Sequence, residues 1–194
     1  RRSLEWRRSM GIGDEEMAVG FLGRLVLEKG LDVFAAAIGE LRKRGTPHRV
    51  LVIGDGPARE AFEAQLPGAV FAGFQGGTDL GRAVASMDVL LNPSVTETFG
   101  NVTLEAMACG VPVVAARATG SSSLVADNKT GRLIEPREIG AYADALAAYS
   151  VDPALRAAHG AAGELASRAY SWDAINKAVA DTYLRLIATK QGSA

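Results

Sequence analysis

Short, continuous apolar runs alternate along most of the chain with longer segments in which apolar residues recur every three or four positions. Short continuous runs are typical of strands that are buried on both faces of a sheet. On this basis we predict strands at residues 17–22, 50–53, 89–91, 113–115 and 131–134, with a further strand starting at 70–71.

The longer segments have the periodicity of helices. Between residues 31 and 44, Leu31, Phe34 and Ile38 fall on one helical face, and Gly45 follows as a stop signal. We predict further helices at residues 58–66, 80–86 and 102–108 and, after the last strand, at 139–149, 153–170 and 172–189.

Strands that alternate with helices indicate a parallel sheet covered on both faces. We therefore predict an α/β fold, a Rossmann-like doubly wound sheet of about six strands with a helical C-terminal tail. No linker divides the chain, so residues 1–194 are expected to form a single domain. Ligands of such sheets bind beyond the carboxyl ends of the strands, which directs attention to residues 23–30, 54–57, 73–77, 92–105 and 116–123.

The composition of the chain makes several classes of function and site improbable. The chain has 194 residues, 48% of them hydrophobic and 22% charged, which are ordinary globular values. A formal net charge of -1 gives no reason to expect a nucleic-acid partner. The single cysteine, Cys109, excludes an internal disulfide, and its apolar surroundings favour a core position. No apolar stretch approaches the ~20 residues of a membrane span, so we expect a cytoplasmic domain.

Several common site signatures are absent from the sequence. Gly54-Asp55-Gly56 begins like a dinucleotide-binding motif, but Arg59 occupies the position of its third glycine. The phosphate-loop signature ending in Gly-Lys-Ser/Thr does not occur. His48 and His159 are far in sequence from any metal-ligand cluster. We therefore expect no bound metal and no cofactor.

Residues 92–105 combine groups suited to a phosphorylated sugar. Gly100 lets a ligand approach the backbone, Asn101 is a candidate N-cap, and the first amides of the helix that follows, at Gly100 to Val102, form a natural phosphate site. Glu105, one turn into that helix, is placed to accept hydrogen bonds from a vicinal diol such as a ribose. Glu97 lies upstream in the loop, where a donor sugar would be. Two solvated acids, one of them helping a helix start, explain the same spacing equally well.

Two cations follow the first predicted strand. Arg24 offers a planar fork for phosphate oxygens, and Lys29 offers a mobile point charge. Both lie at the carboxyl end of that strand. The helix after Gly100 should begin on the same side of the sheet. A departing diphosphate needs this combination of two cations and a helix N-terminus.

These segments together resemble glycosyltransferase family 4, and the resemblance covers residues 7–187. In the order of that family, they are Gly23-Arg24 with Lys29-Gly30, the turn Gly54-Asp55-Gly56-Pro57, Pro93-Ser94, Glu97 followed after seven residues by Glu105, the run Glu105-Ala106-Met107-Ala108-Cys109-Gly110-Val111-Pro112-Val113-Val114, and Ser171-Trp172. The family has two Rossmann-like domains, the GT-B fold. This chain is similar to the C-terminal one only, which holds the nucleotide-sugar donor, whereas the absent N-terminal domain mostly holds the acceptor.

The resemblance also implies roles for individual residues. Arg24, Lys29 and Glu97 would be the catalytic groups, with the two cations on the diphosphate and Glu97 on the donor sugar. Glu105 would hold the ribose. The remaining donor-binding residues would be Gly23 beside Arg24, Phe74 and Gln75 at the edge of the base pocket, and Phe99, Gly100, Asn101 and Val102 through their backbone. Such enzymes generally need no metal.

The chain departs from the family in two places. Where members often carry Gly-Gly-x-Pro-Glu, this sequence has Thr119-Gly120-Ser121-Ser122-Ser123, and we assign that loop no role. The histidine that the family places near the reacting sugar belongs to the N-terminal domain, and nothing in this chain replaces it.

The resulting prediction is the donor half of a retaining glycosyltransferase that transfers a hexosyl group from a UDP- or GDP-sugar to a polysaccharide, lipid or small-molecule acceptor. Its partners would be the donor and the N-terminal domain, and any peripheral membrane contact would run through that missing half. The domain alone should bind nucleotide weakly and transfer no sugar. The alternatives are a nucleotide-sugar epimerase, a phosphorylase, and a non-catalytic nucleotide-sugar-binding module.

Overall fold

The computed structural model describes residues 3–191, with side chains described through residue 189. The described chain forms a six-stranded sheet in the order β3-β2-β1-β4-β5-β6. All its strand pairs are parallel, which confirms the predicted fold class. The strands are β1 (Ala18–Leu22), β2 (Arg49–Ile53), β3 (Val70–Phe71), β4 (Val89–Asn92), β5 (Val113–Ala116) and β6 (Gly131–Ile134). Of the predicted domain range 1–194, residues 1–2 and 192–194 lie outside the described residues.

The strand order reverses direction at the middle of the sheet. From β1 the chain winds outward through β2 to β3, then returns and continues from β4 on the other side of β1. β1 is therefore hydrogen-bonded to β2 on one side and to β4 on the other. The loops that leave β1 and β4 start side by side and run in opposite directions, the arrangement in which doubly wound sheets bind ligands.

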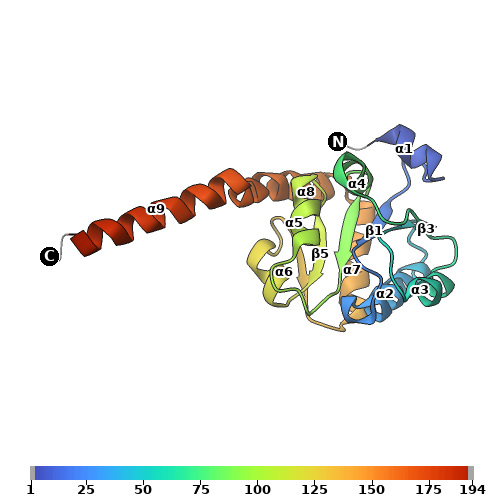
Figure 1. Ribbon diagram of the computed structural model, residues 1–194. Helices are drawn as coiled ribbons and strands as arrows, with labels where there is room; N and C mark the ends of the chain where they lie inside the picture. Colours follow the sequence, from blue (N-terminus) through green and yellow to red (C-terminus); the bar gives the residue numbers. More distant parts are fainter. Residues whose placement is uncertain (1–2, 192–194) are drawn as a thin grey trace.

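Alternate side chains of each strand enter two separate cores. Val19, Phe21 and Val52 point into one core, whereas Ala18 and Leu51 point into the other. The first core lies under α2 (Leu31–Lys43), α3 (Arg59–Gln65) and α7 (Ile139–Val151). The second lies under α4 (Gly77–Val84), α5 (Asn101–Ala108) and α6 (Thr119–Leu124), and α8 (Pro153–Ser167) packs against α5 (Figure 1). This two-sided burial explains why the strands are continuously apolar.

Three phenyl rings fasten the first layer of helices to the sheet. Phe21 of β1, Phe34 of α2 and Phe62 of α3 meet edge to face, with ring centroids 5.5–5.6 Å apart. Edge-to-face pairs stabilise beyond the area that they bury. They hold α2 and α3 against β1.

Two short helices were not predicted from the sequence. α1 (Leu4–Ser9) is too short to show a period, and α6 replaces part of the loop expected at 116–123. The predicted helix at 153–170 is divided into α8 and a 3-10 turn, η2 (Arg168–Tyr170). A second 3-10 turn, η1 (Leu27–Lys29), lies in the loop after β1.

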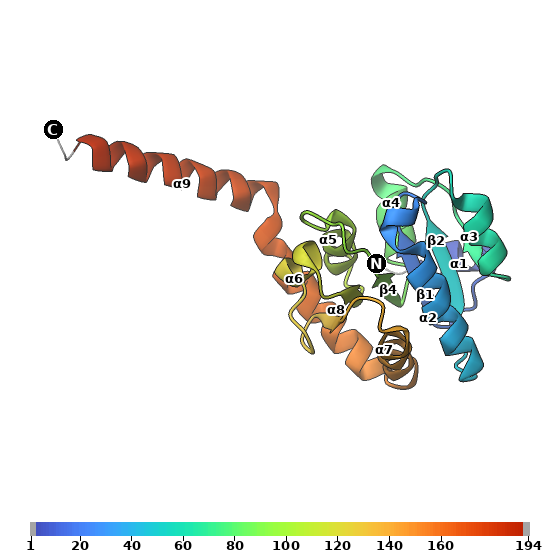
Figure 2. The same ribbon diagram turned by 90° about the horizontal axis from the view of Figure 1, so that it is seen from below.

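The last helix, α9 (Trp172–Gln191), extends away from the body of the domain (Figures 1 and 2). It carries exposed apolar side chains along its length, at Trp172, Ile175, Val179, Tyr183, Leu184, Leu186 and Ile187. Among residues 3–191, no helix has both the length and the apolarity needed to cross a membrane.

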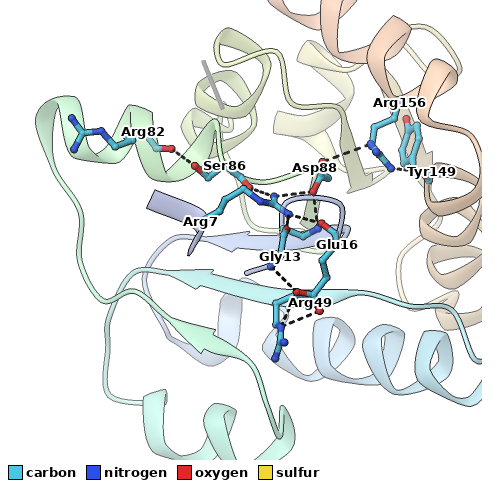
Figure 3. A network of polar contacts seen from close by, with 10 residues as sticks. Arg7, Gly13, Glu16, Arg49, Arg82, Ser86, Asp88, Tyr149 and Arg156 are labelled. Carbon is cyan, nitrogen blue, oxygen red and sulfur yellow. Dashed lines mark hydrogen bonds and ion pairs between the residues drawn. The ribbon is translucent and has the colours of Figure 1, made fainter. Parts of the chain in front are cut away.

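Arg7 of α1 is completely buried and organises the amino-terminal end of the sheet (Figure 3). Its guanidinium donates to Asp88 Oδ2 at 3.0 Å and to the carbonyl oxygens of Ser86, at 2.6 Å, and Gly13, at 2.8 Å, and also to that of Glu16. Asp88 Oδ2 also accepts the backbone N–H of Ala18, at the start of β1. One buried ion pair thus joins α1 to the starts of β1 and β4.

Replacing Arg7 by Met should lower the free energy of unfolding by about 3–5 kcal/mol, because the buried Asp88 carboxylate loses its hydrogen-bonded guanidinium and Arg156 Nε lies farther away, at 3.9 Å. Arg8→Met is the matched control, since the Arg8 side chain is 66% exposed and pairs with Asp14 at the surface. Its cost should stay below about 1 kcal/mol. Urea unfolding of both variants measures the difference, and equal losses would contradict the proposed anchoring role of Arg7.

Candidate functional site

A cavity of about 420 Å³ opens at the carboxyl ends of β1 and β2, beside the first turn of α5. Its wall comes from the ends of both strands, the loops that follow them, the segment after β3, and α4 and α5. The lining residues are Leu22, Gly23, Arg24, Ile53, Gly54, Asp55, Phe74, Gln75, Leu80, Val102 and Glu105.

The cavity gathers one part of the predicted site, and a second part lies along the adjoining β4 loop. The residues that line the cavity are Gly23, Arg24, Phe74, Gln75, Val102 and Glu105. The predicted residues outside the lining are Lys29, in η1, then Glu97, Phe99 and Gly100, between β4 and α5, and Asn101, the first residue of α5. The first part comes from the β1 loop, the segment after β3 and α5, whereas the second comes from the β1 and β4 loops and the first residue of α5.

The loops after β1 and β2 are hydrogen-bonded to each other and pack closely at Gly54. The Leu25 N–H donates to the Asp55 carbonyl oxygen at 2.9 Å, and the Leu25 carbonyl oxygen accepts the Ala58 N–H at 3.0 Å. A Cβ on Gly54, whose φ is 135°, would lie 1.9 Å from the Gly23 carbonyl oxygen, so no other residue fits there. The turn of residues 54–57 therefore holds the backbone that presents Arg24.

A buried amide fixes the β4 loop over α5. Asn92, the last residue of β4, donates from Nδ2 to Thr103 Oγ1 at 3.1 Å and accepts the Ser94 N–H at 3.3 Å. The helix itself starts differently from the prediction. Gly100, with φ of 97°, is the N-cap, and Asn101 is the first helical residue. The prediction of Asn101 as N-cap was therefore wrong, because the chain enters α5 through a left-handed conformation that glycine adopts without steric cost.

Lys29 and Glu97 form an ion pair across the two diverging loops. Lys29 Nζ lies 2.7 Å from Glu97 Oε1, and their side chains are only 28% and 13% exposed. A second contact joins the same loops, because Thr96 Oγ1 donates to the Glu28 carbonyl oxygen at 3.2 Å. The structure thus brings together a cation and a carboxylate that are distant in sequence.

The backbone of Glu97 is held from the other side by α6. The Glu97 carbonyl oxygen accepts the Gly120 N–H at 3.1 Å and the Thr119 hydroxyl at 3.2 Å. A Cβ on Gly120 would come within 2.6 Å of that oxygen. The Thr119–Ser123 segment, to which we assigned no role from the sequence, therefore positions the Glu97 loop.

The remaining cation, Arg24, is held loosely. Its side chain is 69% exposed and lies 3.5 Å from Glu28, itself 54% exposed. Exposed pairs of this kind contribute little to stability. The guanidinium at the edge of the cavity is accordingly available to an anionic ligand.

Glu105 contributes a half-buried carboxyl group to the wall of the cavity. Burial raises the pKa of this carboxyl above its ordinary value. Phe74, which also lines the cavity, is 80% exposed, and Gln75 Nε2 donates to the Ala72 carbonyl oxygen at 2.8 Å. A partly desolvated carboxyl group and an exposed aromatic ring in one cavity suit a ligand that has both hydroxyl groups and a planar ring.

The sequence did not identify the apolar wall of the cavity, formed by Leu22, Ile53 and Leu80. Leu22 and Ile53 are the last residues of β1 and β2 and lie opposite each other in the sheet register. The end of each apolar run was visible in the sequence, but the pairing that makes the two residues neighbours was not.

Other candidate groups have structural partners. His159 Nδ1 lies 2.7 Å from the Tyr149 hydroxyl in the core, and burial lowers the pKa of His159. The Phe99 ring packs on that of Tyr170, with centroids 5.6 Å apart. Within residues 3–189, no three His, Cys, Asp or Glu side chains gather in a way that would hold a metal ion.

Comparison with known proteins identifies the family. The model of the family described as glycosyl transferases group 1 matches residues 16–152, which include both diverging loops and the cavity wall. The chain belongs to this family. Relatives and solved structures of the same kind extend the match over nearly the whole chain.

Among sequence relatives, the GDP-mannose-dependent alpha-mannosyltransferase of Corynebacterium glutamicum is 29% identical over 98% of this chain and 45% of its own length. Among structures, Anabaena HepE in complex with UDP-glucose superposes with a TM-score of 0.81 and 26% identity, over 94% of this chain and 52% of that one. The C-terminal domain of a group 1 glycosyltransferase protein, LpcC, from Francisella tularensis covers 77% of this chain and 83% of its own, with a TM-score of 0.67 and 25% identity.

This member of the group 1 family therefore has the fold of one half of a GT-B enzyme. It spans about half the length of the curated relatives that it matches, 45% of the mannosyltransferase among them.

Glu105→Gln should raise the melting temperature of the unliganded domain at pH 7.5. Because the folded-state pKa lies above the unfolded one, the ionised carboxylate destabilises the fold at neutral pH. That cost disappears as the pH falls below the unfolded pKa of about 4.3, so the gain should vanish near pH 4. Thermal unfolding at both pH values tests this, with exposed Glu60→Gln as a control that should give no gain. A lower melting temperature for Glu105→Gln at pH 7.5 would contradict the assignment.

Proposed function

We propose that this chain is the donor-binding half of a retaining glycosyltransferase that uses a nucleoside diphosphate sugar. The observation that carries the proposal is the half-buried Glu105 carboxyl in a cavity whose rim holds Arg24, beside the start of α5. A ligand with a diol next to a phosphate would satisfy both groups at once.

The donor would lie across the carboxyl ends of β1, β2 and β4. Its ribose hydroxyls would donate to Glu105, and its base would lie between the Phe74 ring and the apolar wall of the cavity. The diphosphate would extend toward Arg24 and the first amides of α5, where the helix dipole favours an anion. In this order of groups, the sugar would lie near Lys29 and Glu97.

In the transfer step, the bond between the anomeric carbon and the β-phosphate oxygen breaks, and its electron pair stays on the leaving diphosphate. The acceptor hydroxyl oxygen bonds to the same carbon with retention of configuration, and its proton is released. Arg24, Lys29 and the α5 amides would stabilise the charge that develops on the diphosphate, and Glu97 would orient the sugar hydroxyls. These residues act without a metal ion in this proposal.

The similar proteins support a hexose donor on a uridine or guanosine nucleotide. Anabaena HepE was crystallised with UDP-glucose, and the Corynebacterium relative is described as GDP-mannose-dependent. We propose that a polysaccharide, lipid or small-molecule acceptor binds to the N-terminal half of the enzyme. Closure of that half over the donor would exclude water, so this chain by itself should bind nucleotide without transferring sugar.

A titration of this chain with UDP, GDP and ADP, with and without Mg²⁺, tests donor binding. Saturable binding of UDP or GDP with the same dissociation constant in both buffers supports the proposal. Failure of all three nucleotides to bind at millimolar concentration, both to this chain and to a protein that carries both halves, would refute it.

Arg24→Ala and Lys29→Ala should each lower kcat by about 10²–10³ in an enzyme that contains both halves, since each removes one preorganised group that stabilises developing charge. Lys43→Ala is the control, because Lys43 is 80% exposed on α2. Steady-state transfer from UDP-glucose or GDP-mannose measures the effect. Near-normal kcat in both site variants would exclude the catalytic assignment.

A further inference from the structure

The cation placed to meet the donor diphosphate is already neutralised within the chain. Lys29 Nζ donates to Glu97 at 2.7 Å, and the carboxylate side chain is only 13% exposed. An ion pair with this little solvent exposure is screened weakly by water and salt. A ligand that binds Lys29 therefore also meets the negative charge of Glu97.

Glu97 is held in this position from both sides. Its carbonyl oxygen is bonded to Thr119 and Gly120 of α6, and the neighbouring Thr96 is bonded to the β1 loop at Glu28. These contacts brace the backbone of the loop on both sides. They hold the Glu97 carboxylate next to the place that the end of the diphosphate would occupy.

The intact donor and the spent nucleotide differ at this end. The β-phosphate of a nucleotide sugar is joined to the sugar by an ester bond and to the α-phosphate by an anhydride bond, so it carries one negative charge, and the attached hexose presents hydroxyl groups that can donate hydrogen bonds to a carboxylate. The terminal phosphate of a free nucleoside diphosphate has a second ionisation near pH 6, so it carries an additional charge and no hydroxyl group of a sugar. Glu97 attracts the first ligand and repels the second.

Resting on the proposed function, we propose that the Lys29–Glu97 pair makes the site discriminate between the intact nucleotide sugar and the spent nucleoside diphosphate, with Glu97 as the specificity-determining residue. Lys29 alone would bind the more highly charged product more tightly. Paired with Glu97, Lys29 favours the nucleotide sugar, which has the hydroxyl groups of a hexose where the free diphosphate has an additional negative charge. The pair would thus promote release of the product.

The test compares dissociation constants of UDP-glucose and UDP, and of GDP-mannose and GDP, measured at pH 8 by calorimetry or NMR on this chain. In Glu97→Gln the side chain keeps its shape and still accepts hydrogen bonds from hydroxyl groups, but the negative charge is gone. The dissociation constant of the nucleotide sugar, divided by that of the free diphosphate, should rise on the order of tenfold. Hydrogen bonds to charged and to neutral groups differ in free energy by an amount that corresponds to about this factor in a dissociation constant.

Three further variants separate this effect from a general loss of binding. Lys29→Gln should shift the ratio in the opposite direction, since it leaves Glu97 without the ammonium that bonds it. Glu105→Gln should weaken all four nucleotides by the same factor, because each of them contains the ribose. Glu60→Gln, an exposed change of equal charge on α3, should alter neither affinity nor ratio.

An unchanged ratio in folded Glu97→Gln, together with uniform weakening in Glu105→Gln, would overturn the discrimination role and leave the proposed donor site intact. A shift of the ratio toward the nucleotide sugar in Glu97→Gln would also overturn it. If Glu105→Gln changed no affinity at all, the donor site itself would be misassigned. Opposite shifts in Glu97→Gln and Lys29→Gln would support the inference.

Discussion

The reversal of winding between β1 and β4 is the constraint on which the rest of the structure depends. Parallel strands need long crossover connections, and these are almost always right-handed, so the two halves of the sheet place their helices on opposite faces. The loops leaving β1 and β4 start next to each other and then part. The residues proposed to bind the donor diphosphate and sugar, Arg24, Lys29, Glu97 and the start of α5, lie on these two loops.

Close contacts of neighbouring backbone segments give the two loops a defined shape. Gly54 lets the β2 loop pack against the Gly23 carbonyl, and Gly120 does the same for α6 against Glu97. Each loop is therefore braced by a neighbouring element and does not depend on the ligand for its shape. Preorganised groups of this kind stabilise developing charge without having to rearrange during the reaction. The same bracing brings Lys29 and Glu97 within 2.7 Å, so the resting site is nearly neutral where the diphosphate would end.

The elements that the sequence predicted well are those whose burial is regular. Continuous apolar runs identified β1, β2, β4 and β5, whose residues are almost all buried. The two edge strands, β3 and β6, were predicted from a shorter run and from a run interrupted by Arg132. α6 was missed because Gly120 and Ser121 favour helix weakly, and the contacts of its first residues with the Glu97 carbonyl hold it in place. The N-cap of α5 was predicted at Asn101 because its side chain is a good capping group, whereas in the structure Gly100 takes the N-cap position in a left-handed conformation. The ion pair between the loops could not be predicted at all, since only the folded sheet shows which ends of the chain meet.

Buried charged groups have different surroundings at the two ends of the sheet. At the amino-terminal end, the Arg7 guanidinium bonds a carboxylate and several carbonyl oxygens, so the charges stabilise the junction of α1, β1 and β4. At the carboxyl end, burial raises the pKa of Glu105, with no offsetting cation among the described residues. This carboxyl lies half-buried in the wall of the cavity, where burial removes part of its hydration. Hydroxyl groups of a ligand in the cavity would supply hydrogen bonds in place of that water and so offset the free energy that burial of the carboxylate costs.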